Sequence, residues 1–269
     1  NIELGLGDNG IAVIGQDFHF NADVVAGDKL ETVEITIRQK GGETYPAEWS
    51  MSIIWDQYKG LKNANIHKHF DLPEDAVEGI YEVVVLVKDQ NGETTEVIRN
   101  LSIYQEGSLP VNPQLILWNV LKNDSPFYGD GEFTNIGQSF SKGDTLYSQV
   151  GVSGIKGEGV VYLLLIHEQA NHHPETIAEI DFDKVIIYYM HRHGGMEDVD
   201  TFSNFEFDME TFTVVRKLPT LEIGASKDNN PTAPNQITWS SGNYQFLMLY
   251  ENETYSINLK EEISIAVEL

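Results

Sequence analysis

Alternation of apolar and polar residues with a period of two is the feature of this sequence that most constrains its fold. The segments KLETVEITIRQK (29–40) and EWSMSIIW (48–55) both place apolar residues at every second position. Successive side chains of a β-strand point to opposite faces, so this pattern is typical of half-buried strands. IYEVVVLVK (80–88) is apolar on both faces and predicts a central strand. No segment has a convincing helical period, and the best helical candidate is PETIAEIDFDKVI (174–186).

Turn and breaker residues divide these strands into hairpins and domains. DQNGE (89–93) contains Asn-Gly, a strong hairpin signal, and TTEVIRNLSIY (94–104) reads as the returning strand. Pro, Gly and Ser in GSLPVNP (107–113) mark a boundary. Beyond it, further strands are expected at 115–121, 144–153, 159–167, 183–190, 201–217, 243–250 and 254–268. The sequence therefore predicts an all-β protein with two domains, 1–106 and 107–269.

A short sequence pattern occurs in both predicted domains. GQSFSKGDTL (137–146) repeats the pattern of GQDFHFNADVVAGDKL (15–30), with Gly-Gln-x-Phe followed by Gly-Asp-x-Leu. The middle of the second copy (168–242) is much longer than that of the first. We therefore expect one sandwich fold to occur twice, the second copy enlarged by an insertion.

Composition limits the partners and the cellular location. The 269 residues include no cysteine, which excludes disulfides and thiolate metal sites and favours a bacterial source. The net charge of −25 disfavours nucleic acid and anionic membrane surfaces as partners and attracts cations. No run of 18 apolar residues predicts a membrane span. Because the sequence starts at Asn1, we expect a removed N-terminal segment, either a signal peptide or a trimmed expression tag.

Three histidines of the first domain form the strongest candidate for chemistry. In NIHKHFDLP (65–73), strand parity sends His67 and His69 to the face opposite the apolar residues, and DFHFNAD (17–23) does the same with His19. Residues i and i+2 of a strand lie about 6.5–7 Å apart, so two imidazoles can converge on one ion. His19 completes a set of three only if the two strands are adjacent.

A carboxylate or water would supply a fourth ligand to such a site. Asp17 and Asp71 share the face of the histidines and are the candidate carboxylates. Imidazole with carboxylate suits Zn²⁺ or another divalent transition metal better than Ca²⁺. The competing interpretation is three solvated or hydrogen-bonded histidines on the outer face of a sandwich.

The second domain offers weaker candidates. MHRHGG (190–195) carries His191 and His193 with like parity, and these form a second possible metal pair. HEQANHH (167–173) does not fit the zinc-protease signature, because its first two histidines are five residues apart instead of four. We find no nucleophile elbow, phosphate loop or dinucleotide fingerprint, so we expect a protein that is not an enzyme.

The first domain resembles a family of uncharacterised domains in exported lipoproteins of Bacteroidetes-type bacteria. The resemblance covers residues 1–105 and rests on an early His beside aromatics (His19), a His-x-His strand before Pro73, and the pattern from Gly79 through Gly92. It implies an immunoglobulin-like β-sandwich and export, and it implies no activity. A lipid anchor would require a cysteine ahead of Asn1.

These observations lead to one expected function and two alternatives. We expect an exported protein of the cell surface or periplasm, with a binding or structural role, that holds a transition metal in its first domain. One alternative is a glycan-binding surface lipoprotein, for which TWSSGNYQF (238–246) offers Trp239 and Tyr244 as stacking aromatics. The other is a pilus or adhesin subunit, which would bind another surface protein through a sheet edge.

Overall fold

The computed structural model of the chain describes residues 1–134, 138–211, 213–215, 220–225 and 238–269. It consists of two compact units, Asn1–Pro110 and Val111–Leu269. The described segments are β-strands and loops with short 3₁₀ turns at Asp56–Tyr58, Glu106–Ser108, Glu168–Ala170 and Ile177–Glu179, which confirms the all-β prediction. In the described part of the chain, no helix has the length and apolar character needed to cross a bilayer.

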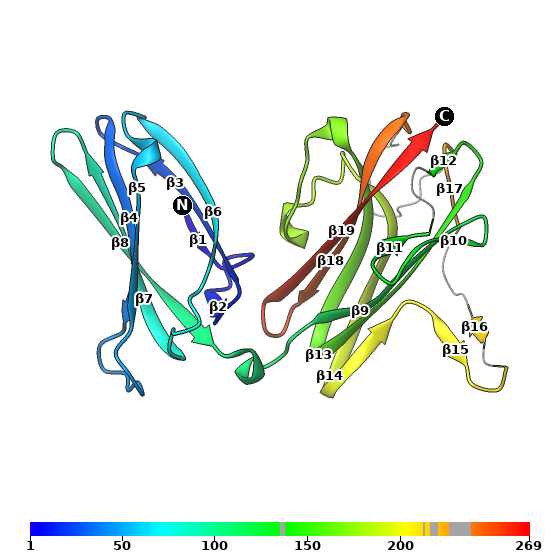
Figure 1. The fold of residues 1–269 in the computed structure, drawn as a ribbon, viewed down its shortest axis with the longest axis horizontal. Helices are drawn as coiled ribbons and strands as arrows, with labels where there is room; N and C mark the ends of the chain where they lie inside the picture. Colours follow the sequence, from blue (N-terminus) through cyan, green and yellow to red (C-terminus); the bar gives the residue numbers. More distant parts are fainter. Residues whose placement is uncertain (135–137, 212, 216–219, 226–237) are drawn as a thin grey trace. The chain divides into compact units, whose positions relative to one another are not determined.

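The first unit is a sandwich of two sheets (Figure 1). The smaller sheet has the order β1-β3-β6, with strands β1 (Ile2–Leu4), β3 (Asp17–Val25) and β6 (Asn63–Asp71). The larger sheet has the order β2-β8-β7-β4-β5, with strands β2 (Ile11–Val13), β4 (Leu30–Gln39), β5 (Ser50–Trp55), β7 (Gly79–Asp89) and β8 (Thr94–Tyr104). As its sequence predicts, β7 is a central strand between β8 and β4.

The core of the first unit lies between these sheets and follows the period-two pattern. Phe18 and Phe20 of β3 are buried against the larger sheet, where Ile35 of β4 and Val83 of β7 are also buried. The Asn-Gly hairpin is confirmed, because β7 and β8 pair along their length and Gly92 takes the positive φ of 89° that the turn requires. Strand alternation thus determines which side chains fill the core and which lie on the outer face of each sheet, where they are available for binding.

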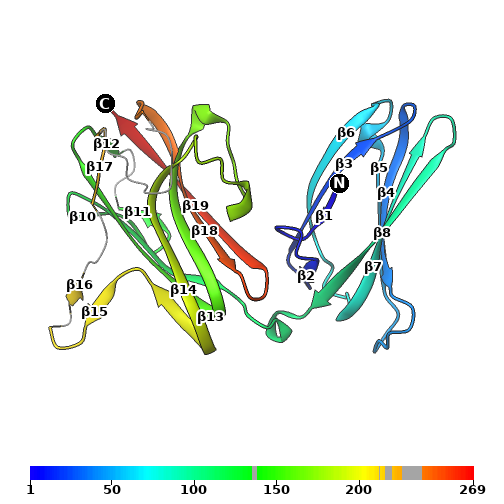
Figure 2. The ribbon, with the colours of Figure 1, turned by 180° about the vertical axis from the view of Figure 1, so that it is seen from behind.

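The second unit is built on one large curled sheet, which Figure 2 shows from behind. Its path is β11-β10-β9-β13-β18-β19-β12, and β14 and β17 also pair with β13. The strands are β9 (Gln114–Lys122), β10 (Ser125–Gly129), β11 (Glu132–Phe133), β12 (Ser139–Ser141), β13 (Thr145–His167), β14 (Ile186–Ser203), β17 (Leu221–Glu222), β18 (Gly242–Asn252) and β19 (Ile257–Glu268). A separate hairpin joins β15 (Glu206–Asp208) to β16 (Thr213–Val215).

Two predicted strands of the second unit are one strand in the structure. We expected separate strands at 144–153 and 159–167, and β13 runs through both. Its first half pairs with β9 and its second half with β18. Gly154 and Gly157 adopt positive φ values of 71° and 73° between the halves, so the chain bends there without leaving the sheet.

The prediction of a single strand at 201–217 is also wrong, because this segment is divided between two elements. Its first residues belong to the end of β14, which begins at Ile186 and pairs with β13 through several register shifts. Residues 206–208 and 213–215 form the small hairpin, and residues 212, 216 and 217 lie outside the described chain. Gly137, which opens the second copy of the predicted repeat, also lies outside it. The duplication stays a prediction.

The helical candidate 174–186 is also wrong. It forms a loop with one 3₁₀ turn and then enters β14. Ile180 and Val185 of this loop are buried with Leu247 and Leu249 of β18, on the face of the sheet opposite the main core. The apolar residues that suggested a helix therefore anchor a loop, and this covering explains why the second half of β13 is apolar on both faces.

Candidate metal centre

Strands β3 and β6 bring the three candidate histidines of the first unit together. The two strands are antiparallel neighbours, with His19 directly opposite His69 and Asn21 directly opposite His67. The apolar residues that flank the histidines along each strand pack into the core, where Ile66 and Phe20 are fully buried. Because the period is two, every histidine is then directed to the outer face of the small sheet.

The rings form a nearly regular triangle. The centroid distances are 5.0 Å for His19 and His67, 5.1 Å for His19 and His69, and 5.2 Å for His67 and His69. The Nε2 atoms of His67 and His69 are 3.2 Å apart. One ligand nitrogen from each ring can be chosen so that the three lie within 4.8 Å of one another. The arrangement could hold a metal ion.

Carboxylates complete the surroundings of the triangle. The Nδ1–H of His69 donates to Asp17 Oδ2 at 2.6 Å, and in a neutral ring this bond selects the tautomer in which Nε2, which faces Nε2 of His67, carries the lone pair. Glu3 of β1 places Oε1 3.7 Å from Nε2 of His19. The structure does not bring Asp71 into the group of ligand atoms, although it faces Asp17 across the two strands.

No sequence pattern indicated Glu3, and Asp17 was predicted as a metal ligand instead of a hydrogen-bond acceptor. Asp17 was a candidate fourth ligand. The structure instead places its carboxylate in a hydrogen bond with Nδ1 of His69, the ring nitrogen that does not face His67. Glu3 belongs to a three-residue strand, and so short a segment carries no period from which its face could be read. The signal for Asp17 was its parity with His19, which alone cannot separate a ligand from a hydrogen-bond acceptor.

The second histidine pair lies within the second unit and has different partners. His191 stacks on Phe202 with a centroid distance of 4.8 Å, and the buried His193 stacks on Tyr250. Nε2 of His193 lies 2.9 Å from the Tyr250 hydroxyl. Among the described residues, neither histidine joins a group of three metal-ligating side chains. The prediction of a metal here has no support from the neighbours of the pair.

Burial gives His193 a different role, in pH-dependent stability. Desolvation holds the pKa of His193 below the usual 6.5 and outweighs the backbone contact with Gly157, which raises it. The unfolded chain therefore binds more protons than the folded one below about pH 6.5, so stability falls as the pH decreases through that range. We expect His193→Gln to lose less stability than the wild type between about pH 7.5 and about pH 5 in urea unfolding. The exposed His173→Gln should keep the wild-type loss, and equal losses in all three proteins would contradict this role.

The aromatics proposed for glycan stacking are not at the surface. Trp239 and Tyr244 are both buried in the main core of the second unit, with their ring centroids 5.5 Å apart. The Tyr244 hydroxyl is within hydrogen-bonding distance of the backbone of Ser240. These residues therefore anchor a loop, and the glycan alternative loses the stretch on which it was based.

Comparison with known proteins identifies a family for the first unit and gives only weak structural matches to the whole chain. Residues 2–104 match the model of a domain of unknown function (DUF4625), so a DUF4625 domain covers β1 through β8 and carries the three histidines. The expected resemblance is confirmed to this extent. Its immunoglobulin-like, lipoprotein and Bacteroidetes parts stay predictions. The curated proteins offer no match to the chain.

Two solved structures show a weak likeness. One is described as "Structural insight into host cell surface retention of a 1.5-MDa bacterial ice-binding adhesin", with 10% identity, a TM-score of 0.27, and coverage of 100% of this chain and 64% of that chain. The other is described as "Ca2+-stabilized adhesin helps an Antarctic bacterium reach out and bind ice", with 10% identity, a TM-score of 0.23, and coverage of 100% and 49%. This chain thus spans less than two thirds of either one. At these scores the likeness supports no inference about function.

Proposed function

We propose that the first unit binds a divalent transition metal, with Zn²⁺ as the first choice, through His19, His67 and His69. The triangle of rings at 5.0, 5.1 and 5.2 Å carries this proposal. Two nitrogens that each lie about 2.0–2.1 Å from a tetrahedral ion are about 3.3–3.4 Å apart. The 3.2 Å between Nε2 of His67 and Nε2 of His69 is close to that separation.

The donor set determines the class of metal. Three imidazoles suit Zn²⁺, Cu²⁺ or Ni²⁺, whereas Ca²⁺ and Mg²⁺ prefer sites made of oxygen ligands. His67 and His69 are exposed, so a fourth position can be taken by water or by a group from outside. The net charge of −25 favours the approach of a cation.

Asp17 is assigned a positioning role in this site. A carboxylate that accepts from Nδ1 of a ligating histidine fixes its tautomer and ring orientation. We expect Asp17→Asn to weaken Zn²⁺ binding by about 10–100-fold, the usual cost of losing such a partner. Competition with a chromophoric chelator measures the affinity, and the tautomer of His69 can be followed by ¹⁵N chemical shifts. Asp71→Asn, which removes the carboxylate opposite Asp17, should have little effect, and equal effects of both variants would contradict the assignment.

The proposal extends to a protein that works outside the cytoplasm in a binding or structural role. The net charge of −25 suits an exported protein that must stay soluble, and the lack of cysteine argues against a eukaryotic secreted protein, which would usually carry disulfides. The metal would then tie β3 to β6 and stabilise the small sheet, because a ligand that binds only the folded state raises its stability.

Metal analysis of protein purified without a histidine tag tests the proposal. We expect one Zn²⁺ per chain after dialysis, and an increase in Tm when Zn²⁺ is added that Ca²⁺ does not reproduce. Binding of no metal above the level of a variant that lacks all three histidines would overturn the proposal.

A further inference from the structure

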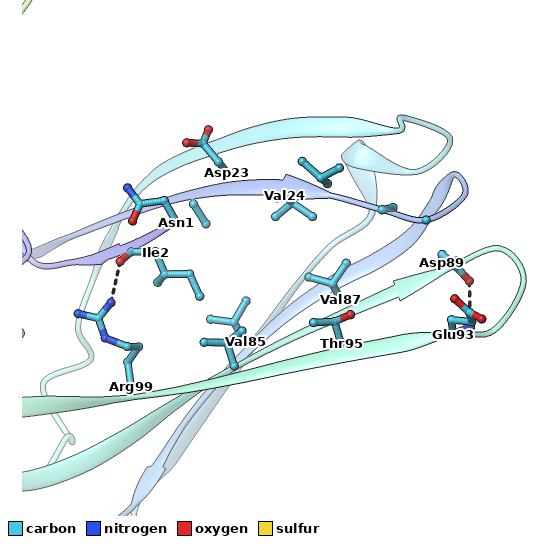
Figure 3. A pocket seen from close by; sticks show the side chains of 15 residues that line it. Asn1, Ile2, Asp23, Val24, Val85, Val87, Asp89, Glu93, Thr95 and Arg99 are labelled. Carbon is cyan, nitrogen blue, oxygen red and sulfur yellow. Dashed lines mark hydrogen bonds between the residues drawn. The ribbon is translucent and has the colours of Figure 1, made fainter.

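We propose that a groove between the two sheets of the first unit binds an extended, positively charged peptide of another protein, which pairs with the free edge of β8. The groove has a volume of about 330 Å³ and lies between β1 and β3 on one side and β7 and β8 on the other (Figure 3). It lies within the first unit and shares no residue with the histidine triangle. The inference is therefore independent of the proposed metal site.

The edge of β8 beside this groove has no strand partner over most of its length. Among the described residues, β7 pairs with one side of β8 from Thr94 to Ile103, and β2 pairs with the other side only from Ser102 to Tyr104. A sheet edge of this kind is a template for an added strand, which is a recurring way of binding extended peptides.

The backbone groups on this free edge can be identified. Ser102 N–H donates to the Gly10 carbonyl, and the Tyr104 carbonyl accepts from Ile14 N–H, so the even-numbered residues of β8 direct both groups to the side of β2. By the period of a strand, Glu96 and Ile98 present theirs on the same side, whereas the Asn100 carbonyl lies beside Gly10. The groups of Glu96 and Ile98 are those to which an added strand would bond.

The side chains of β8 that face the groove supply an apolar lining. Thr95 and Val97 are paired with Val87 and Val85 of β7. All four line the groove, and Val24 of β3 lies across from Val87 (Figure 3). Val97 remains 40% exposed and therefore has apolar surface that a ligand can cover. A strand that pairs with β8 directs every second side chain into this lining, so the occupant needs apolar residues at alternate positions.

The charges of the groove determine the polarity of the peptide. At the end near the β7–β8 turn, carboxylate oxygens of Asp89 and Glu93 both lie within 4 Å of the position that a Cβ at Gly27 would take. Oδ1 of the buried Asp89 accepts from the N–H groups of Asn91 and Glu93, whereas the Glu93 side chain is exposed and has no cationic partner among the described residues, so Glu93 is the main group open to a peptide cation. At the other end, Arg99 is already held by Asp8 and by the Ile2 carbonyl. A peptide with Lys or Arg at the turn end and neutral residues elsewhere is therefore complementary to the groove.

A synthetic peptide with two lysines followed by alternating valine and threonine is the probe. We expect fluorescence anisotropy to detect its binding to the whole chain, with at least tenfold weaker binding for Val97→Asp and for Glu93→Lys. Ile98→Asp is the matched control, because Ile98 has a similar exposure of 44% on the opposite face of the same strand. Its affinity should stay near the wild-type value.

Two further measurements separate strand addition from other kinds of binding. Ile98→Pro removes an N–H on the free edge that β7 does not use, a change that edge strands tolerate, and it should weaken binding at least tenfold relative to Ile98→Ala. N-methylation of alternate amides of the peptide should abolish binding. Undiminished binding of the methylated peptide would overturn the proposal in favour of a small apolar ligand or simple charge attraction. Absence of peptide binding would overturn it as well, and self-association abolished by Val97→Asp would identify a second copy as the occupant.

Discussion

His67→Ala is expected to weaken Zn²⁺ binding by more than the 10–100-fold that loss of an outer partner such as Asp17 costs. The wild type offers three imidazole ligands, from His19, His67 and His69, which form a closed triangle. The variant removes one of them, so the ion is bound by two imidazoles only. Isothermal titration of the metal-free protein measures the change. His67 is exposed, so the fold should tolerate the substitution, and the circular dichroism spectrum should stay that of the wild type.

The control for this prediction is His173→Ala. His173 is also exposed, but it lies in the second unit and belongs to no group of ligating side chains among the described residues. It tests whether any surface imidazole contributes to the measured binding. If His173→Ala weakens binding as much as His67→Ala does, the metal is held nonspecifically and the triangle is not the site.

Phe20→Ala is expected to have the largest effect on the stability of the first unit. Phe20 is fully buried between the sheets and packs on Trp55 with a centroid distance of 5.2 Å. Truncation of a buried phenylalanine costs about 3–5 kcal/mol through lost burial and the cavity left behind. Denaturant unfolding monitored by tryptophan fluorescence measures the loss.

Val25→Ala provides the matched comparison on the same strand. Val25 is 77% exposed, and surface substitutions of this kind change stability by about 0.5 kcal/mol or less. A loss for Phe20→Ala no larger than that for Val25→Ala would contradict the alternation on which the placing of His19 depends.

The sequence predicted the faces of the strands well and their neighbours poorly. Parity alone placed Ile66 in the core and His67 outside it, because a strand with one buried face has no freedom to change the side of a residue. Whether β3 and β6 are adjacent depends on sheet topology. More than 40 residues separate His19 from His67 in the chain, and no local pattern encodes that pairing.

The errors in the second unit have the same origin. Gly154 and Gly157 read as strand breakers, yet the neighbouring strands β9 and β18 continue the pairing on either side of the bend. Ile180 and Val185 read as a helical stripe, yet their contacts are with a sheet that is assembled from residues far along the chain. In both cases tertiary pairing overrides the local preference.

The free edge of β8 and the histidine triangle also illustrate what the sequence leaves open. TTEVIRNLSIY was predicted as a strand, and its alternation says nothing about which of its edges is paired. That knowledge comes from the short length of β2, which covers three residues of β8. Both candidate binding sites of the first unit therefore arise from strand order.

X-ray absorption at the zinc edge of the Zn²⁺-loaded protein tests the metal site most directly. We predict three nitrogen ligands at about 2.0–2.1 Å with the outer-shell scattering of imidazole rings, and loss of that scattering in a variant without His19, His67 and His69. A spectrum with oxygen ligands alone, or one that the variant leaves unchanged, would contradict the proposed centre.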